Sequence, residues 1–192
     1  GGREHALGWK IRQSPLLENL HFMPGNAGTA GVGRNVEIDP HNHMRVLEFC
    51  RDNNIDLVVI GPDEYLAEGL ADFLSQNKVR VFGPTKAAAQ LEWSKSFAKT
   101  FMMENGIPTA AYRTFDRSDE AITYLKTRQF PVVIKADGLA FGKGVVVAED
   151  YPGAERAVIS MLDERAFGAA GTSVIIEEYL SGEEISVHAF CD

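Results

Sequence analysis

The chain has 192 residues, of which 45% are hydrophobic and 24% charged, and a formal net charge of −8. This length allows one large domain or two small ones, each able to bury a core. The negative charge disfavours nucleic acid and anionic membranes as partners, and no apolar run approaches the roughly 20 residues that a membrane span requires. The two cysteines, Cys50 and Cys191, lack metal-ligand spacing, which favours free thiols and a cytoplasmic location.

Residues 1–84 alternate between helical and strand patterns, which predicts a parallel sheet covered by helices on both faces. The run "DLVVI" is apolar on successive residues, as in a strand that is buried on both faces. The chain opens on "GGREHA", which is typical of a turn and a first helix, so we expect a Rossmann-like domain that lacks its first strand. We predict helices at 3–13, 40–53 and 65–76, and strands at 19–23, 56–61 and 79–83.

The pattern changes after residue 84. Residues 85–110 predict a helical linker that closes at Asn105-Gly106, with Thr85 or Ser94 as helix caps. Adjacent strands joined by short loops then indicate a largely antiparallel α+β domain over residues 111–192. The last predicted strand runs to the end of the chain, so we expect a fragment of a longer protein. We predict strands at 111–115, 130–137, 144–150, 173–179 and 184–190, and helices at 118–127 and 152–164.

The stretch "VVIKADGLAFGKGVVVAED" places a glycine-rich loop between two apolar strands. Gly138, Gly142 and Gly144 let the backbone approach a ligand closely, and amides beside Lys143 can hold phosphate oxygens. Lys135 ends the first strand, so its ammonium should project near the loop. The G-x-x-x-x-G-K-[ST] string of a Walker A loop is absent. Taken alone, a solvated hairpin with two surface lysines explains the stretch equally well.

A second candidate element is "VIIEEYLSGEEISV". Glu177 and Glu178 end an apolar strand, and the backbone of Tyr179 and Leu180 can meet the edge of a base. Glu184, at the start of the next predicted strand, can accept hydrogen bonds from ribose hydroxyls. The alternative is a charged hairpin rim.

A third element is Lys95, in "EWSKSFAK", for which a solvent-facing side chain is the alternative. Together the three elements resemble the nucleotide site of the ATP-grasp superfamily. Within it, the ordered segments "GGREHA", "PGNAGT", "FGPT", "AAQLEWSKSFAK", "GIPTA", "VIKADGLAFGKGVVVA", "AFGAAG" and "VIIEEYLSGEEIS" resemble the phosphoribosylamine–glycine ligase family over the whole chain.

The resemblance implies an ATP site in the second half of the chain. The loop 138–144 would cover the β- and γ-phosphates, and Lys135 and Lys143 would act in catalysis by offsetting phosphate charge. The implied nucleotide-binding residues are Lys95, Lys135, Gly138, Gly142, Lys143, Gly144, Glu177, Glu178, Tyr179, Leu180 and Glu184.

The resemblance also implies a phosphoribosylamine site in the first half, where a helix opens with amides able to meet a phosphate. The family's Mg²⁺ ligands and glycine-binding residues are expected beyond residue 192, so we assign no metal ligand here. Phe141 and Asp63 depart from the family's usual residues, and aspartate at position 63 shortens the family's carboxylate by one methylene. The implied substrate-binding residues are Gly2, Arg3, Glu4, Asn26, Gly28, Thr29, Gly61, Pro62 and Asp63.

The function implied by the resemblance is ATP-dependent ligation of glycine to 5-phosphoribosylamine through a glycyl phosphate. Alternatives are another ATP-grasp carboxylate–amine ligase or carboxylase, or a nucleotide-binding module without catalysis. A Rossmann dehydrogenase is disfavoured, because "GGREHA" lacks the G-x-G-x-x-G spacing and no acidic residue ends the strand "NLHFM".

Overall fold

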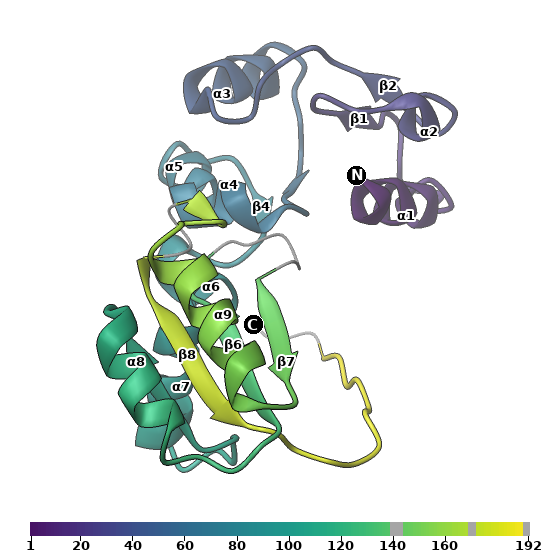
Figure 1. Cartoon of the computed structure of the whole chain (residues 1–192). Helices are drawn as coiled ribbons and strands as arrows, with labels where there is room; N and C mark the ends of the chain where they lie inside the picture. The colour runs from purple at the N-terminus through teal and green to yellow at the C-terminus, as the bar shows by residue number, and fades with distance from the viewer. Residues whose placement is uncertain (139–143, 169–171, 190–192) are drawn as a thin grey trace. The chain divides into compact units, whose positions relative to one another are not determined.

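A computed structural model describes residues 1–138, 144–168 and 172–189, and the chain divides into two compact units, Gly1–Trp93 and Ser94–Asp192 (Figure 1). The predicted linker, residues 85–110, contains one helix of each unit. None of the helices in the described part of the chain combines the length and the apolar character needed to cross a membrane.

The first unit alternates helices with short parallel strands, which confirms the predicted fold class. Strand β1 pairs in parallel with β2, and β3 with β4, so that His21 lies opposite Arg34 and Val58 opposite Val81. The two pairs form separate sheets, because no strand among the described residues pairs with both. The elements are α1 (Gly2–Ile11), β1 (His21–Phe22), α2 (Ala27–Ala30), β2 (Arg34–Asn35), α3 (His43–Asp52), β3 (Val58–Val59), α4 (Asp63–Glu68), α5 (Leu70–Gln76), β4 (Val81–Phe82) and α6 (Lys86–Trp93).

The predicted boundaries differ from the observed ones, and two of the differences have a clear local cause. The single helix predicted at 65–76 is wrong: Gly69 has a φ of +93°, which ends α4, and a new helix begins at Leu70. Helix α3 begins at His43, because the side chain of Asn42 caps it by accepting from the Arg45 amide at 3.1 Å.

The core of the first unit joins α3 to α4, α5 and α6. Cys50 belongs to this core, and burial raises the pKa of its thiol, so the thiolate is disfavoured and the cysteine is expected to be unreactive. The buried members of the core are Val46, Leu47, Cys50, Ile60, Leu66, Leu70, Ala71, Leu74 and Ala89.

Gly8 gives α1 its close contact with β1. A Cβ atom placed on Gly8 would lie 2.2 Å from Cζ of Phe22. We expect Gly8→Ala to lower the free energy of unfolding by about 1–3 kcal/mol, because overpacking outweighs the helix propensity that alanine adds. Urea unfolding followed by circular dichroism measures this change. Gly2→Ala, on the same helix with no atom within 4 Å of the added Cβ, is the matched control; equal losses in the two variants would contradict the packing argument.

The second unit is an antiparallel α+β domain, as predicted. Its sheet has the strand order β5-β8-β6-β7, and every neighbouring pair is antiparallel. The elements are α7 (Lys95–Glu104), β5 (Tyr112–Phe115), α8 (Ser118–Leu125), β6 (Val132–Ala136), β7 (Val145–Ala148), α9 (Tyr151–Leu162) and β8 (Val174–Glu178).

The two faces of this sheet differ in what covers them. Figure 1 shows α8 and α9 lying across one face, and alternate residues of β6 and β8, including Ile134 and Ile176, are buried against them. Because successive strand residues point to opposite faces, Val133 and Lys135 belong to the other face. Register adds Val145, Ile175 and Glu177 to that second face. We call it the lysine face.

The strand predicted at 184–190 is wrong over its described part. Residues 179–189 form no strand, and Ile185 and Val187 are 84% and 89% exposed. A strand requires a neighbour that accepts and donates backbone hydrogen bonds, and none of the described strands pairs with this segment.

Candidate functional site

Lys135 occupies the boundary between the buried and the exposed parts of the lysine face. It lies opposite Ile175 of β8, while Val133 lies opposite Glu177. Diagonal neighbours on one face of an antiparallel pair are within reach of long side chains. Lys135 Nζ accordingly donates to Glu177 Oε2 at 3.0 Å. The Lys135 side chain is 28% exposed and that of Glu177 only 4%, so the ammonium presents charge to solvent while its partner is buried.

Lys99 is a functional candidate that the sequence prediction missed. This buried residue of α7 donates to Thr109 Oγ1 at 2.7 Å and to the Ala110 carbonyl at 3.3 Å. Its Nζ also lies 3.2 Å from Glu177 Oε2. The signal that could have identified it is its spacing of four residues from Lys95, which places both on the same face of a helix.

Lys95 is the first residue of α7, and its side chain reaches the glycine-rich loop. The helix begins there because Ser94, one of the two predicted caps, accepts from the Phe97 amide at 3.3 Å. Lys95 Nζ donates to the carbonyl of Gly138 at 3.0 Å. Since Lys135 precedes Gly138 by only three residues, the structure brings both lysines to the start of the predicted phosphate loop.

Asp137 fixes the point at which this loop leaves β6. Its carboxylate accepts from the amide of Gly138 at 2.9 Å and from the amide of Ser96 at 3.2 Å. It also accepts from the hydroxyl of Ser96 and, at 3.5 Å, from that of Ser173. One carboxylate therefore joins β6, the start of α7 and the approach to β8. The sequence prediction missed this role, because the partners lie far apart in the chain.

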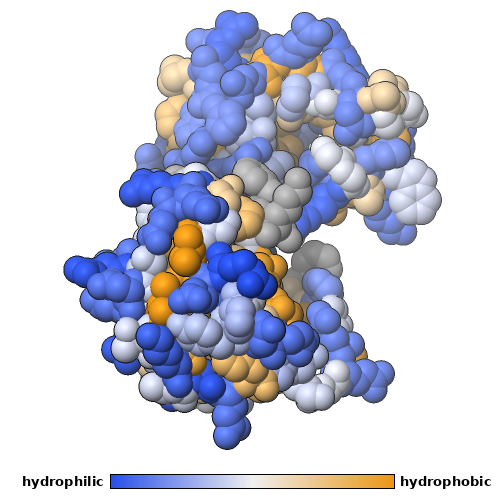
Figure 2. Space-filling view, in the orientation of Figure 1, coloured by the Kyte–Doolittle hydropathy of each residue, from blue (hydrophilic) through white to orange (hydrophobic). Residues whose placement is uncertain are grey.

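The far end of the loop returns to the sheet at Gly144, whose carbonyl accepts from the Ala136 amide at 2.8 Å. The predicted loop residues Gly142 and Lys143, together with Phe141, lie outside the described residues. The lysine face continues into β7 with Val145 and Val147, which are each 46% exposed. The surface of this unit mixes apolar and polar residues (Figure 2).

The connection after β8 is exposed, and hydrogen bonds between described residues hold only Glu178, at its start, to a neighbouring segment. Glu178 is held to residue 111 twice: its amide donates to the Ala111 carbonyl at 2.9 Å, and its Oε1 accepts from the Ala111 amide at 2.9 Å. Tyr179 and Leu180 are exposed. Glu184 lies in the exposed segment that follows and forms no hydrogen bond or ion pair with other described residues. The structure thus brings Glu177, but not Glu184, to Lys135 and Lys99.

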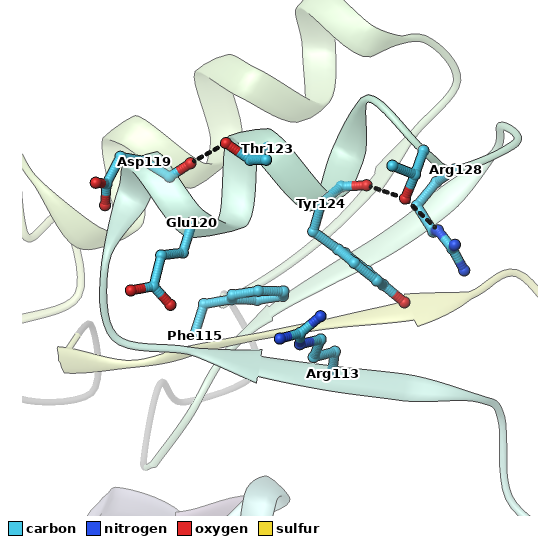
Figure 3. A pocket seen from close by; sticks show the side chains of 8 residues that line it. Arg113, Phe115, Asp119, Glu120, Thr123, Tyr124 and Arg128 are labelled. Atoms are coloured by element: carbon cyan, nitrogen blue, oxygen red, sulfur yellow. Dashed lines mark hydrogen bonds between the residues drawn. The ribbon is translucent and has the colours of Figure 1, made fainter.

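A hollow of about 500 Å³ lies on the opposite face of the sheet, between β5 and α8 (Figure 3). Its walls carry two guanidinium groups: Arg128 Cζ is 4.5 Å and Arg113 Cζ 5.6 Å from the centre of the Tyr124 ring. Figure 3 shows both arginines beside that ring. Arg113 lies opposite Ile176 of the helix-covered face. None of the predicted site residues lines this hollow.

A second hollow, of about 520 Å³, reaches the connection after β8. Glu177, Glu178 and Tyr179 line it together with Arg128 and Val132. Neither Lys95 nor Lys135 lines it, so it does not coincide with the contact of Lys95 with the loop.

In the first unit, most of the predicted substrate residues lie at the N-terminal ends of two helices, α1 and α4. Arg3 Nη1 donates to Asp63 Oδ1 at 3.3 Å, which links the first turn of α1 to the first residue of α4. A Cβ placed on Gly61 would lie 2.7 Å from Glu4 Oε1, so only glycine fits at this position without displacing the carboxylate. Pro62 is the N-cap of α4, and Gly2 opens α1.

The start of α2 joins the same group. Asn26 donates from Nδ2 to the Gly1 carbonyl at 3.4 Å, and its Oδ1 accepts from the amides of Gly28 and Thr29 at 2.8 and 3.1 Å. The Thr29 side chain is buried, and its hydroxyl donates to Asn35 Oδ1 at 2.8 Å. Thr29 therefore supports the start of α2 from a buried position, through its contacts with Asn26 and Asn35.

Comparisons with known proteins agree with this two-part division. The family described as "Phosphoribosylglycinamide synthetase, N domain" matches residues 1–92, and "Phosphoribosylglycinamide synthetase, ATP-grasp (A) domain" matches residues 93–192. A phosphoribosylamine–glycine ligase of Rhodopirellula baltica is 48% identical over 198 residues, which cover 100% of this chain and 45% of the relative. The trifunctional purine biosynthetic protein adenosine-3 of Gallus gallus is also 48% identical, with 100% of this chain and 19% of that protein covered.

Solved structures show the same relationship. The crystal structure of a phosphoribosylamine–glycine ligase from Thermotoga maritima matches with a TM-score of 0.76 and 34% identity, over 95% of this chain and 43% of that one. The biotin carboxylase domain of a 2-oxoglutarate carboxylase from Hydrogenobacter thermophilus, a complex with MgADP and bicarbonate, matches with a TM-score of 0.62 at 19% identity, which shows a shared fold alone. The chain spans about 45% of the length of the curated ligases that it matches.

Proposed function

Because the chain belongs to the phosphoribosylglycinamide synthetase family, we propose that it serves the ATP-dependent ligation of glycine to 5-phosphoribosylamine. An oxygen of the glycine carboxylate takes the γ-phosphoryl group of ATP, which gives glycyl phosphate and ADP. The amine of phosphoribosylamine then attacks the carbonyl carbon, loses a proton and expels inorganic phosphate, which leaves glycinamide ribonucleotide. Activation is required because a free carboxylate is a poor acyl donor, and the protein contributes positioning and charge neutralisation.

The observation that carries this proposal is the placement of two lysines at the start of one glycine-rich loop. Lys95 contacts the first loop carbonyl, and Lys135 lies three residues before it on the lysine face. Cations and amides arranged around one point suit the oxygens of a triphosphate. We assign phosphate binding to Lys95 and Lys135, with the amides of Gly138 and Gly144, and extend the assignment to Gly142 and to a catalytic Lys143.

The remainder of the nucleotide is assigned to neighbouring elements. The exposed side chains of Val145 and Val147 provide apolar surface beside Lys135, and a base is flat and largely apolar on its faces. We assign the edge of the adenine to the connection 177–180, and the ribose hydroxyls to Glu184. The last assignment requires the segment 179–189 to approach the sheet.

In the first unit, we assign phosphoribosylamine to the group formed by the starts of α1, α2 and α4. Backbone amides at helix starts favour phosphate oxygens. Arg3 adds a positive charge there, although it is shared with Asp63. The assigned residues are those of the sequence prediction: Gly2, Arg3, Glu4, Asn26, Gly28, Thr29, Gly61, Pro62 and Asp63.

Magnesium accompanies ATP in the proposed reaction and would neutralise phosphate charge. Within residues 1–138, 144–168 and 172–189, no three His, Cys, Asp or Glu side chains are grouped so as to hold a metal ion.

Measuring the release of inorganic phosphate from ATP by the full-length protein tests the proposal. We expect release from ATP that requires both glycine and phosphoribosylamine, with neither sufficient alone. Phosphate release that requires bicarbonate instead would show that the protein is a carboxylase. Binding of ATP without turnover under any of these conditions would favour a nucleotide-binding module.

A further inference from the structure

Glu177 is shared by two ammonium groups on the lysine face. Its Oε2 lies 3.0 Å from Lys135 Nζ and 3.2 Å from Lys99 Nζ. The exposed fractions of the Glu177 and Lys99 side chains are only 4% and 8%. Glu177 Oε1 is buried too and accepts no hydrogen bond from the described residues. The three side chains therefore hold two positive charges and one negative charge in a largely buried cluster.

The two lysines differ in their freedom to exchange partners. Lys99 has an acceptor for each of its three N–H bonds, in Thr109, Ala110 and Glu177, so it is fixed where it lies. Lys135 has a more exposed side chain and contacts Glu177 alone among the described residues. An anion arriving at the lysine face therefore meets Lys135 and leaves Lys99 in place.

We propose that Lys99 is a positioning residue: by pairing with Glu177 and neutralising its charge, it leaves the charge of Lys135 available to the phosphate oxygens of the nucleotide. This inference rests on the proposed function, since it concerns the same ATP site. Without Lys99, Glu177 and Lys135 would form a neutral pair, and a phosphate would have to compete with the buried carboxylate for the ammonium. With Lys99, the cluster has a net charge of +1 from its two lysines and one glutamate.

A purely structural role for Lys99 predicts something different. If the ion pair served only to join α7 to β8, loss of Lys99 would lower stability and weaken all ligands alike. The charge-balancing role predicts a loss confined to ligands that carry phosphates. It also predicts that removing the Glu177 carboxylate together with Lys99 leaves the positive charge of Lys135 available to phosphate again.

The experiment compares ATP with adenosine, each titrated calorimetrically into the 192-residue chain. Lys99→Met is expected to weaken ATP binding on the order of tenfold, because Glu177 would then pair with Lys135 alone and compete with the phosphates for its ammonium. It should leave adenosine binding within about twofold. Lys99→Met/Glu177→Gln should return the ratio of ATP to adenosine affinity to within about threefold of its value in the unaltered chain, and this ratio cancels any loss of adenine contact that follows from removing the Glu177 carboxylate. Lys99→Arg retains the charge and should stay within the same range. Lys126→Met, which removes one positive charge from the same unit at the end of α8, is the matched control.

The outcomes separate this inference from the function on which it rests. Equal ATP affinity in Lys99→Met and the unaltered chain would overturn the charge-balancing role alone. A double variant whose ratio of ATP to adenosine affinity is as low as that of the single variant would overturn it too. If Lys99→Met does not fold, the double variant decides, since it buries no unpaired charge: a near-normal ratio of ATP to adenosine affinity supports the role and a low ratio overturns it. If the unaltered chain binds neither ATP nor inorganic triphosphate, the proposed function and this inference both fail.

Discussion

Lys135→Met is expected to weaken ATP binding by about 10- to 100-fold, because a charge-assisted hydrogen bond to a phosphate oxygen contributes roughly 1.5–3 kcal/mol. Methionine retains the length and the apolar stem of lysine, so the strand and its packing should persist. The loss should fall on ligands with phosphates and spare adenosine. Isothermal titration with ATP, adenosine and inorganic triphosphate measures the three affinities.

The control for this prediction is a lysine of the same unit that lies away from the loop. Lys126→Met changes the net charge by the same amount and should leave ATP affinity within about twofold, since surface charges beyond a Debye length are largely screened. Equal effects of the two variants would show that the protein attracts ATP by its overall charge and not by contact with Lys135.

Glu177→Ala is expected to lower the free energy of unfolding of the second unit by about 3–5 kcal/mol, the usual cost of removing one partner of a buried ion pair. Lys99 would then remain buried without its counter-charge, since its other two partners are a hydroxyl and a carbonyl. Alanine would also leave a cavity between α7 and β8. Urea unfolding of the chain, monitored by circular dichroism, measures the change.

Glu178→Ala is the matched control, because Glu178 follows directly in the same strand but is exposed and accepts one hydrogen bond, from the Ala111 amide. Its loss should cost about 1 kcal/mol. The double variant Lys99→Met/Glu177→Gln should be closer in stability to the unaltered chain than Glu177→Ala is, since a buried ion pair replaced as a pair is often nearly neutral. If Glu177→Ala and Glu178→Ala had the same free energy of unfolding, this would contradict the argument that Glu177 is needed to balance the buried charge of Lys99.

Local patterns in the sequence predicted the second unit well. The runs "VVIK" and "GVVVA" are apolar stretches on either side of the glycine-rich loop, and they form the antiparallel pair β6 and β7 as predicted. Lys95, predicted to bind the nucleotide, donates to the Gly138 carbonyl at the start of the glycine-rich loop at 3.0 Å, and its binding role stays a prediction. Each of these features depends on residues close together in the chain or on a resemblance that spans it.

The features that the sequence did not predict depend on distant partners. Lys99 has the pattern of a surface lysine on an amphipathic helix, and it is buried only because Glu177 lies across from it in a strand 78 positions along the chain. Asp137 has the pattern of a turn residue, yet it joins three segments. The strand predicted at 184–190 has suitable residues, but strand formation requires a neighbour that local pattern does not supply.

The central claim is that the two lysines at the start of the glycine-rich loop hold the phosphates of ATP. A crystal structure of the chain with ATP tests it most directly. We expect Lys95 Nζ and Lys135 Nζ each within about 3 Å of a phosphate oxygen. Lys99 should keep its contact with Glu177 in that complex. A triphosphate bound instead between Arg113 and Arg128 on the opposite face, with Lys95 still on Gly138 and Lys135 still on Glu177, would contradict the claim.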